Sequence, residues 1–217
     1  MGKNFLGLDE ASQYFKVQMT QESIEALKEI PFSEDVLMSC KDTHLLVADL
    51  GISLIDMLDI LNKAETEQQK LLCQGSPWSK AGPWIQSEDF ARLPDKPQWR
   101  LLRKTAVPNS LGKNWDEQQA LLAKDEEVPT GRQIGYAVTL NCLVSHERLF
   151  KDVWLNTCDV DSQGRRMLFC QFVERPLHPL GLPEGYLGLS EPFWSPDGRY
   201  SNLGLASTRK PNKTLNP

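Results

Sequence analysis

Two adjacent capped helices, predicted within residues 114–138, constrain the fold more than any other part of the sequence. Asn114 is a good N-cap residue, and Glu117 three positions later completes a capping box. Pro129 ends the first helix, and Thr130 is placed to cap the second, in which apolar residues recur at helical spacing. The segments that follow have the composition of short strands. We therefore expect this helix pair to form a layer on which a C-terminal β region folds.

The rest of the chain alternates between short helical and short extended patterns, which predicts an α+β fold. Ser33 and Ser53 each precede a helical pattern as N-caps. Helices are predicted at 5–15, 20–30, 33–39, 53–61 and 87–93, and strands at 43–49, 99–107, 153–157, 166–173 and 200–209. Residues 159–164, DVDSQG, predict a hairpin turn between two of these strands.

Composition excludes several classes of protein. The chain has 217 residues, of which 40% are hydrophobic and 24% charged, as in an ordinary globular protein. A net charge of −5 without a basic stripe argues against binding to nucleic acid. The most apolar window, 44–61, is interrupted by three aspartates, which argues against a membrane span. No signal-peptide pattern opens the sequence, so we expect a soluble, cytoplasmic protein.

The cysteines predict buried, reduced thiols rather than disulfides or a metal site. The sequence has 5 cysteines, an odd number, and none forms a CxxC pair. Only 3 histidines are available to complete a zinc site. We therefore expect no bound metal and no cofactor.

The motifs that could carry catalysis or bind calcium are each incomplete. Residues 159–164 resemble the start of a calcium loop, but Cys170 stands where the bidentate glutamate would be needed. Glu191 precedes a proline, as in calcium-dependent lectins, but no set of amide ligands accompanies it. Ser145, His146 and Glu147 are adjacent in sequence, and adjacent residues on a helix point in different directions. The sequence therefore predicts no catalytic residue.

Aromatic and polar side chains gather late in the chain. Aromatic residues, Arg and Asn dominate the energetically important positions of binding surfaces. The residues predicted to form such a recognition face are Tyr186, Trp194, Arg199, Tyr200, Ser201 and Asn202. Trp194 and Tyr200 would act as aromatic anchors, with Arg199 and Asn202 as hydrogen-bonding groups. The alternative is that Trp194, like Phe193 beside it, belongs to the core.

The order of motifs resembles that of C-type-lectin-like domains, in particular the formylglycine-generating-enzyme-like branch. A Trp-led helix followed by Glu127-Val128-Pro129-Thr130 is similar to that family's "rLPTeaEW" passage. The hairpin that begins Val153-Trp154-Leu155-Asn156-Thr157 is similar to its "yWtSs…dg.a" hairpin, and 202–209 is similar to its "nnnlGfR" strand. The resemblance implies a lectin-type scaffold over 99–209, preceded by a mostly helical region, 1–98, that packs on the core and followed by a tail, 210–217.

The resemblance extends to the variable proteins of diversity-generating retroelements and to a bacterial family of similar length, and it implies a binding role. The Arg-Gly-Gly-Ser-Trp strand and the paired catalytic cysteines of the generating-enzyme branch are absent. The calcium ligands and disulfides of animal lectins are absent as well. We therefore expect a non-catalytic module that binds a protein or small-molecule ligand, without nucleic acid or membrane.

Two alternatives stay open at the level of sequence. The first is an enzyme on the same scaffold that uses a thiol among Cys142, Cys158 and Cys170. The second is a structural or assembly protein that forms a homo-oligomer through the helices predicted within 5–39.

Overall fold

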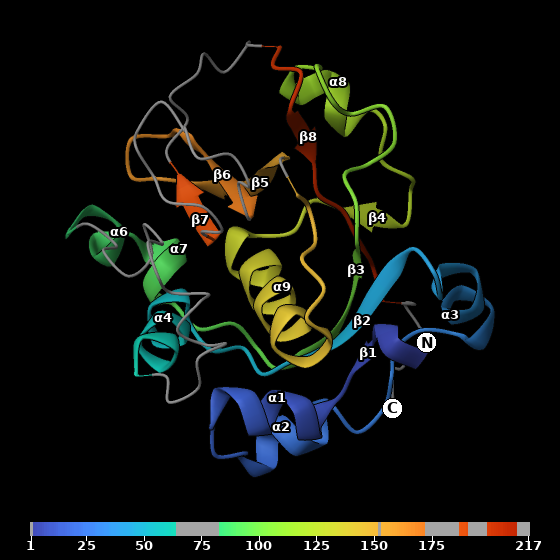
Figure 1. Ribbon diagram of the computed structural model, residues 1–217, viewed down its shortest axis with the longest axis vertical. Coiled ribbons are helices and arrows are strands. Elements are labelled where there is room, and N and C mark those ends of the chain that lie inside the picture. The colour runs from blue at the N-terminus through green and yellow to red at the C-terminus, as the bar shows by residue number, and fades with distance from the viewer. Residues whose placement is uncertain (1, 64–82, 152, 172–186, 191–198, 212–217) are drawn as a thin grey trace.

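A computed structural model describes residues 2–63, 83–151, 153–171, 187–190 and 199–211. The protein has an α+β fold, as predicted, with two mixed sheets and helices around them (Figure 1). The helical elements are η1 (Gly2–Asn4), α1 (Leu8–Phe15), α2 (Gln21–Ala26), α3 (Glu34–Cys40), α4 (Leu54–Asn62), α6 (Pro83–Ser87), α7 (Asp89–Arg92), α8 (Trp115–Gln119) and α9 (Gly131–Ser145). The strands are β1 (Phe5–Leu6), β2 (His44–Asp49), β3 (Gln98–Arg103), β4 (Glu126–Glu127), β5 (Trp154–Val160), β6 (Arg166–Gln171), β7 (Leu187–Ser190), β8 (Leu203–Leu205) and β9 (Thr208–Arg209).

The first sheet joins the two ends of the chain. Its strand order is β1-β2-β3-β9-β4. Strand β1 is parallel to β2, and the other pairs are antiparallel. Strand β2 pairs with β3 from His44 opposite Arg103 to Asp49 opposite Gln98. The expected division at residue 98 therefore falls at the start of a strand that is bonded along its length to the N-terminal region.

The second sheet has the order β7-β6-β5-β8, with β8 parallel to β5 and the other pairs antiparallel. The hairpin predicted around 159–164 is present between β5 and β6. The continuous last strand predicted at 200–209 is wrong. Residues 199–202 lie outside any strand, β8 pairs with β5, and β9 pairs with β3 and β4 of the other sheet. The chain changes sheet at Ala206 and Ser207, which are both buried.

Helix α9 lies at the centre of the molecule and contacts both sheets as well as α1 and α4 (Figure 1). The predicted cap is confirmed: the Thr130 hydroxyl accepts a hydrogen bond from Gln133 N–H, and the Gln133 side chain accepts one from Thr130 N–H. The helix runs to Ser145 and ends where His146 adopts a left-handed backbone conformation. Because α9 is buried on nearly all sides, it serves as the shared core element of both sheets.

Most apolar side chains of α1, α4, α9 and the first sheet form one core. Its fully buried members include Phe15, Leu46, Met57 and Leu101, and the Phe15 and Tyr136 rings stack with centroids 4.7 Å apart. Burying one such side chain contributes about 1.5–3 kcal/mol. A smaller second cluster consists of Trp154, Leu168 and Leu203, with Tyr200 packed against it. This second cluster underlies the turn that precedes β8.

The other sequence-predicted elements are largely present, with displaced ends. Ser33 and Ser53 cap α3 and α4 through hydrogen bonds from Val36 N–H and Asp56 N–H. The helix predicted at 5–15 begins only at Leu8, because the residues before it pair with β2 as β1. The helix predicted at 87–93 appears as α7, with α6 ahead of it. Within the described residues, no helix has both the length and the apolar character needed to cross a bilayer.

Candidate functional site

Helix α8 carries the side chains that organise the predicted recognition face. Its N-terminus has the expected capping box: Asn114 Oδ1 accepts from Glu117 N–H at 3.0 Å, and Glu117 Oε2 accepts from Asn114 N–H at 3.1 Å. The hydrogen bond from the Asn114 backbone, with the Arg199 side chain, lowers the pKa of Glu117. The Glu117 carboxylate is therefore ionised at neutral pH and can hold a cation with its second oxygen.

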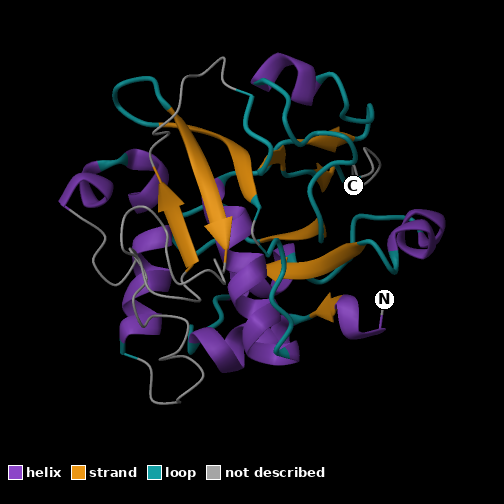
Figure 2. Cartoon of the chain, turned by 45° about the horizontal axis from the view of Figure 1, so that its top comes forward, coloured by secondary structure: helices purple, strands orange, loops and turns teal. Residues whose placement is uncertain are grey.

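That cation is Arg199. Arg199 Nη2 donates to Glu117 Oε1 at 2.7 Å and ties the segment before β8 to α8. The backbone of the turn, residues 199–202, is fixed as well. Tyr200 O accepts from Gly112 N–H at 3.1 Å and from Leu203 N–H at 3.0 Å, and Asn202 O accepts from Trp154 N–H at 2.8 Å. Figure 2 shows α8 at the top of the molecule, flanked by loop segments.

The structure brings four of the six predicted site residues together on this turn. Arg199, Ser201 and Asn202 are exposed, whereas Tyr200 is half-buried against Trp154, Leu168 and Leu203. Tyr200 is thus partly a packing residue. The other two predicted residues, Tyr186 and Trp194, lie outside the described residues, as does Phe193.

Two interactions near the turn were not predicted from the sequence. Gln118 is fully buried, whereas the helical spacing of Trp115, Gln119 and Leu122 in the sequence predicts that those three residues form the packed face. In the structure Trp115 is half-buried and Gln119 exposed. The Arg166 guanidinium lies 3.5 Å from the centroid of the Trp115 ring and donates to Thr157 O at 3.2 Å. Burial lowers the pKa of Arg166, as expected for a cation that has been partly removed from water.

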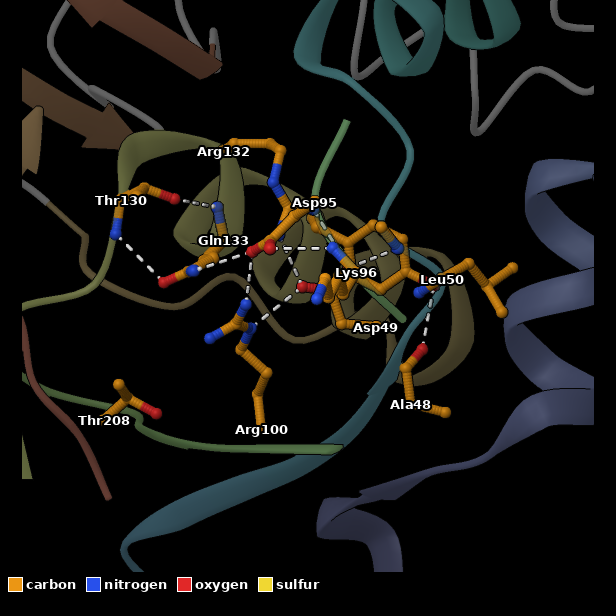
Figure 3. Close-up of polar contacts among 12 residues, drawn as sticks. Ala48, Asp49, Leu50, Asp95, Lys96, Arg100, Thr130, Arg132, Gln133 and Thr208 are labelled. Carbon is orange, nitrogen blue, oxygen red and sulfur yellow. Dashed lines mark hydrogen bonds and ion pairs between the residues drawn. The ribbon is translucent and has the colours of Figure 1, made fainter. Parts of the chain in front are cut away.

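A second polar constellation lies at the N-terminal end of α9 (Figure 3). Asp49, at the end of β2, receives Arg132 Nη1 at 3.0 Å and Arg132 Nη2 at 2.7 Å on its two oxygens, and Arg100 Nε at 3.0 Å. Asp95 accepts from Arg100 Nη2 at 2.5 Å, Arg132 Nη2 at 3.0 Å and Gln133 Nε2 at 3.2 Å. Two carboxylates and two guanidiniums therefore balance their charges.

The charges of this cluster are held in place rather than available for proton transfer. Burial alone would raise the pKa of Asp49, but the charge and hydrogen bonds of Arg132 bring that pKa below its ordinary value. The pKa of Asp95 is also lowered, because hydrogen bonds from Gln133 and the Arg100 charge outweigh its burial. The cluster links β2, β3, α9 and the loop before β3, so its role is structural.

The cysteines do not provide a reactive thiol among the described side chains. Cys40 and Cys142 are buried, and burial raises the pKa of Cys142. Cys158 is exposed, contrary to the expectation of burial, yet desolvation and the neighbouring Asp159 raise its pKa to about 11. Cys73 and the side chain of Cys170 lie outside the described part of the chain. An activated thiol requires the opposite shift.

The turn predicted at 159–164 is present at 161–165, since Asp159 and Val160 belong to β5, and hydrogen bonds within the fold use the carboxylates of Asp159 and Asp161. Asp161 Oδ1 accepts from Gln163 N–H and Arg165 N–H, at 2.9 and 2.8 Å. Asp159 Oδ2 accepts from Gly131 N–H at 2.6 Å and so caps α9. No group of three or more His, Cys, Asp or Glu side chains suited to a metal occurs within the described ranges. Ser145 donates to Asn141 O, one turn back on α9, rather than to His146.

Comparisons of this chain with protein-family models, with curated proteins and with solved structures find no match.

Proposed function

We propose that this protein is a non-catalytic binding module built on a C-type-lectin-like scaffold. Its recognition face comprises the turn Arg199, Tyr200, Ser201 and Asn202 together with α8, and we expect Tyr186 and Trp194 to extend it. The observation that supports this proposal most strongly is that both the backbone and a side chain of this turn are held by the rest of the fold. Its backbone is hydrogen-bonded to Gly112 and Trp154, and Arg199 is ion-paired to Glu117.

A surface of this kind is suited to binding because the fold already holds it in one conformation. A flexible loop loses conformational entropy when it binds, and a preorganised one loses less. The carbonyl oxygens of Tyr200 and Asn202 are hydrogen-bonded to the scaffold, whereas the side chains of Ser201 and Asn202 are exposed. These two side chains present a hydroxyl and an amide, which both donate and accept hydrogen bonds.

The partner would be a protein or a small molecule that offers both polar and flat apolar groups. Tyr200 contributes an aromatic edge at low entropic cost, and Arg199 contributes a planar guanidinium with donors left over from its bond to Glu117. Arg166, stacked on half-buried Trp115, adds an aromatic–cationic pair on the α8 side. Aromatic residues and arginine are the types that dominate interface energetics.

The order of elements supports the lectin-like part of the proposal. The sequence motifs fall on α8, on the start of α9, on the β5–β6 hairpin and on β8. Strand β8 lies next to β5, and β9 enters the sheet that holds the N-terminal strands. The raised pKa values of Cys142 and Cys158 favour a binding role over the alternative of a thiol enzyme.

A selection experiment tests this function. The wild-type protein would be panned against a random 12-residue peptide display library, with a triple variant, Arg199→Ala, Ser201→Ala and Asn202→Ala, as the counter-target. We expect enrichment of peptides that bind the wild type and are lost on the triple variant. Enriched peptides that bind both proteins equally would place recognition elsewhere and contradict the proposal.

A further inference from the structure

Gln118 lies beneath the turn and uses its whole amide group to join three segments. Its Nε2 donates to Ser110 O at 3.0 Å and to Leu203 O at 3.1 Å, and its Oε1 accepts from Asn156 Nδ2 at 2.7 Å. The side chain is fully buried. Both amide hydrogens are thus used, and the bonds reach the loop before α8, strand β8 and strand β5.

We propose that Gln118 is the positioning residue of the recognition face, setting the height and orientation of the turn 199–202 above α8. The inference rests on the proposed function of that turn. Leu203 O, which Gln118 holds, belongs to the residue that directly follows the turn, and Leu203 N–H closes the turn onto Tyr200 O. A shift of Leu203 would therefore move the turn with it.

Consecutive residues of α8 grip the turn from opposite sides. Glu117 holds Arg199 at the surface, whereas Gln118 holds Leu203 from the interior. Asn114 supports both, because its side chain caps Glu117 N–H and its carbonyl accepts from Gln118 N–H at 2.9 Å. The face is thus built on one short, doubly anchored helix.

The surrounding packing explains why an amide is required at position 118. On its outer edge β8 is met by the loop before α8: Val107 N–H donates to Leu205 O, and Leu205 N–H donates to Ser110 Oγ. A Cβ on Gly204 would lie 2.9 Å from the Ala106 Cβ, so the loop and strand already touch. Carbonyls buried at such a seam need donors, and an unsatisfied buried polar group is costly.

Gln118→Glu is the informative substitution because it changes the donors and keeps the shape. An ionised carboxylate can accept from Asn156 but cannot donate to Ser110 O or Leu203 O. A protonated carboxyl regains one donor, and burial favours this form by raising the pKa of a carboxyl. A defect caused by lost donors should therefore be partly repaired at low pH, whereas a packing defect should not.

The readout is hydrogen exchange at three amides that report the turn, Gly112, Leu203 and Trp154, measured by NMR as protection factors at pH 7 and pH 5. In Gln118→Glu we expect protection at these amides to fall about 10-fold or more at pH 7, relative to amides of β2, and to recover in part at pH 5. Gln118→Met, which keeps the volume without donors, should show the loss without the recovery. Thr157→Val removes a buried hydroxyl that donates to Met167 O and serves as the matched control.

The second readout is affinity for the tightest 12-residue peptide recovered by panning against the wild type. We expect Gln118→Glu to weaken this affinity about 10-fold at pH 7 and Thr157→Val to leave it within about 2-fold. Wild-type protection in both Gln118 variants, or global unfolding of both at pH 5 and pH 7, would overturn the positioning role. Lost protection with unchanged peptide affinity would overturn it too. Failure to recover any turn-dependent peptide would contradict the proposed function, while the exchange result would stand by itself.

Discussion

Arg132 at the start of α9 and Asp49 at the end of β2 form a two-point ion pair, with both side chains buried and the two residues 83 positions apart in sequence. Arg100 and Asp95 complete the cluster, so the N-terminal strands and the central helix are fixed to each other by charge. This contact places β2 and α9 in one unit with β3.

Removing one partner of this pair should strongly destabilise the protein. Arg132→Met leaves the buried Asp49 carboxylate with the Arg100 guanidinium and the Gly51 N–H as its partners among the described residues. Breaking a buried ion pair costs about 3–5 kcal/mol. We expect the free energy of unfolding, measured by urea denaturation at pH 7, to fall by that amount. Arg92→Met, which removes an exposed pair with Asp89, is the control and should cost less than about 1 kcal/mol. Equal losses of unfolding free energy in the two variants would show that the buried ion pair contributes no more to stability than the exposed one.

His44 should make stability depend on pH between 4 and 6.5. The side chain is buried, Thr43 Oγ1 lies 2.8 Å from its Nδ1, and its Nε2 has no hydrogen-bond partner in the described structure. Burial and the nearby charges of Arg103 and Arg209, opposed by those of Glu126 and Asp125, lower its pKa from 6.5 to about 4. The unfolded chain therefore binds a proton in this range and the folded chain does not.

Because protons bind the unfolded state more tightly, the contribution of His44 to the free energy of unfolding is fully present above pH 6.5 and is lost as the pH falls toward 4. At 1.36 kcal/mol per pKa unit, this group alone should cost about 2 kcal/mol between pH 7 and pH 5. Urea unfolding of the wild type and of His44→Leu at both pH values tests the expectation. The variant should lose this difference, and an equal pH dependence in the two proteins would refute the assignment to His44.

Cys158 should alkylate slowly despite its exposure. Its pKa of about 11 leaves little thiolate at pH 8. We expect iodoacetamide to modify it roughly 10- to 100-fold more slowly in the folded protein than in urea, with a rate that rises steeply above pH 9. Peptide mapping by mass spectrometry measures both rates. Fast modification of Cys158 at pH 7 in the folded state would instead support the alternative that the protein is an enzyme with a reactive thiol.

Substitutions of Arg199 and Tyr200 should change the free energy of unfolding by different amounts, because Arg199 is exposed and Tyr200 packs against the second cluster. Arg199→Ala removes an exposed ion pair with Glu117 and should change the free energy of unfolding by less than about 1 kcal/mol. Tyr200→Ala uncovers the cluster of Trp154, Leu168 and Leu203 and should cost about 1–2 kcal/mol. Thermal unfolding of the two variants gives the comparison. If Tyr200→Ala proved neutral, its ring would be free for a ligand rather than committed to the second cluster.

Local features of the fold follow from the sequence because their causes are local. The Asn114–Glu117 capping box, the Thr130 cap and the turn at Asp161 each depend on residues within four positions of one another. Helix existence and the β5–β6 hairpin were predicted for the same reason. The end of α9 was less predictable, since it depends on the backbone conformation of His146.

The features that were not predicted from the sequence depend on residues far apart in the chain. A period-two pattern cannot show that β8 and β9 join different sheets, because this is decided by pairing with Trp154 and Leu101 far along the chain. The Asp49 cluster and the Gln118 network likewise join residues tens of positions apart. Helical spacing favours Gln119 rather than Gln118 as a packed residue of α8. This prediction is wrong because α8 has only 5 residues, too few for periodicity to identify its buried side.

The central claim, that the turn 199–202 is a recognition face, is tested most directly by one affinity measurement. Isothermal titration of the tightest turn-selected peptide would compare the wild type with Arg199→Ala, Asn202→Ala and the distant control Arg92→Ala. We predict that the two turn variants weaken the dissociation constant about 10-fold or more, while Arg92→Ala binds like the wild type and all four proteins keep similar melting temperatures. Unchanged affinity in both turn variants would contradict the account.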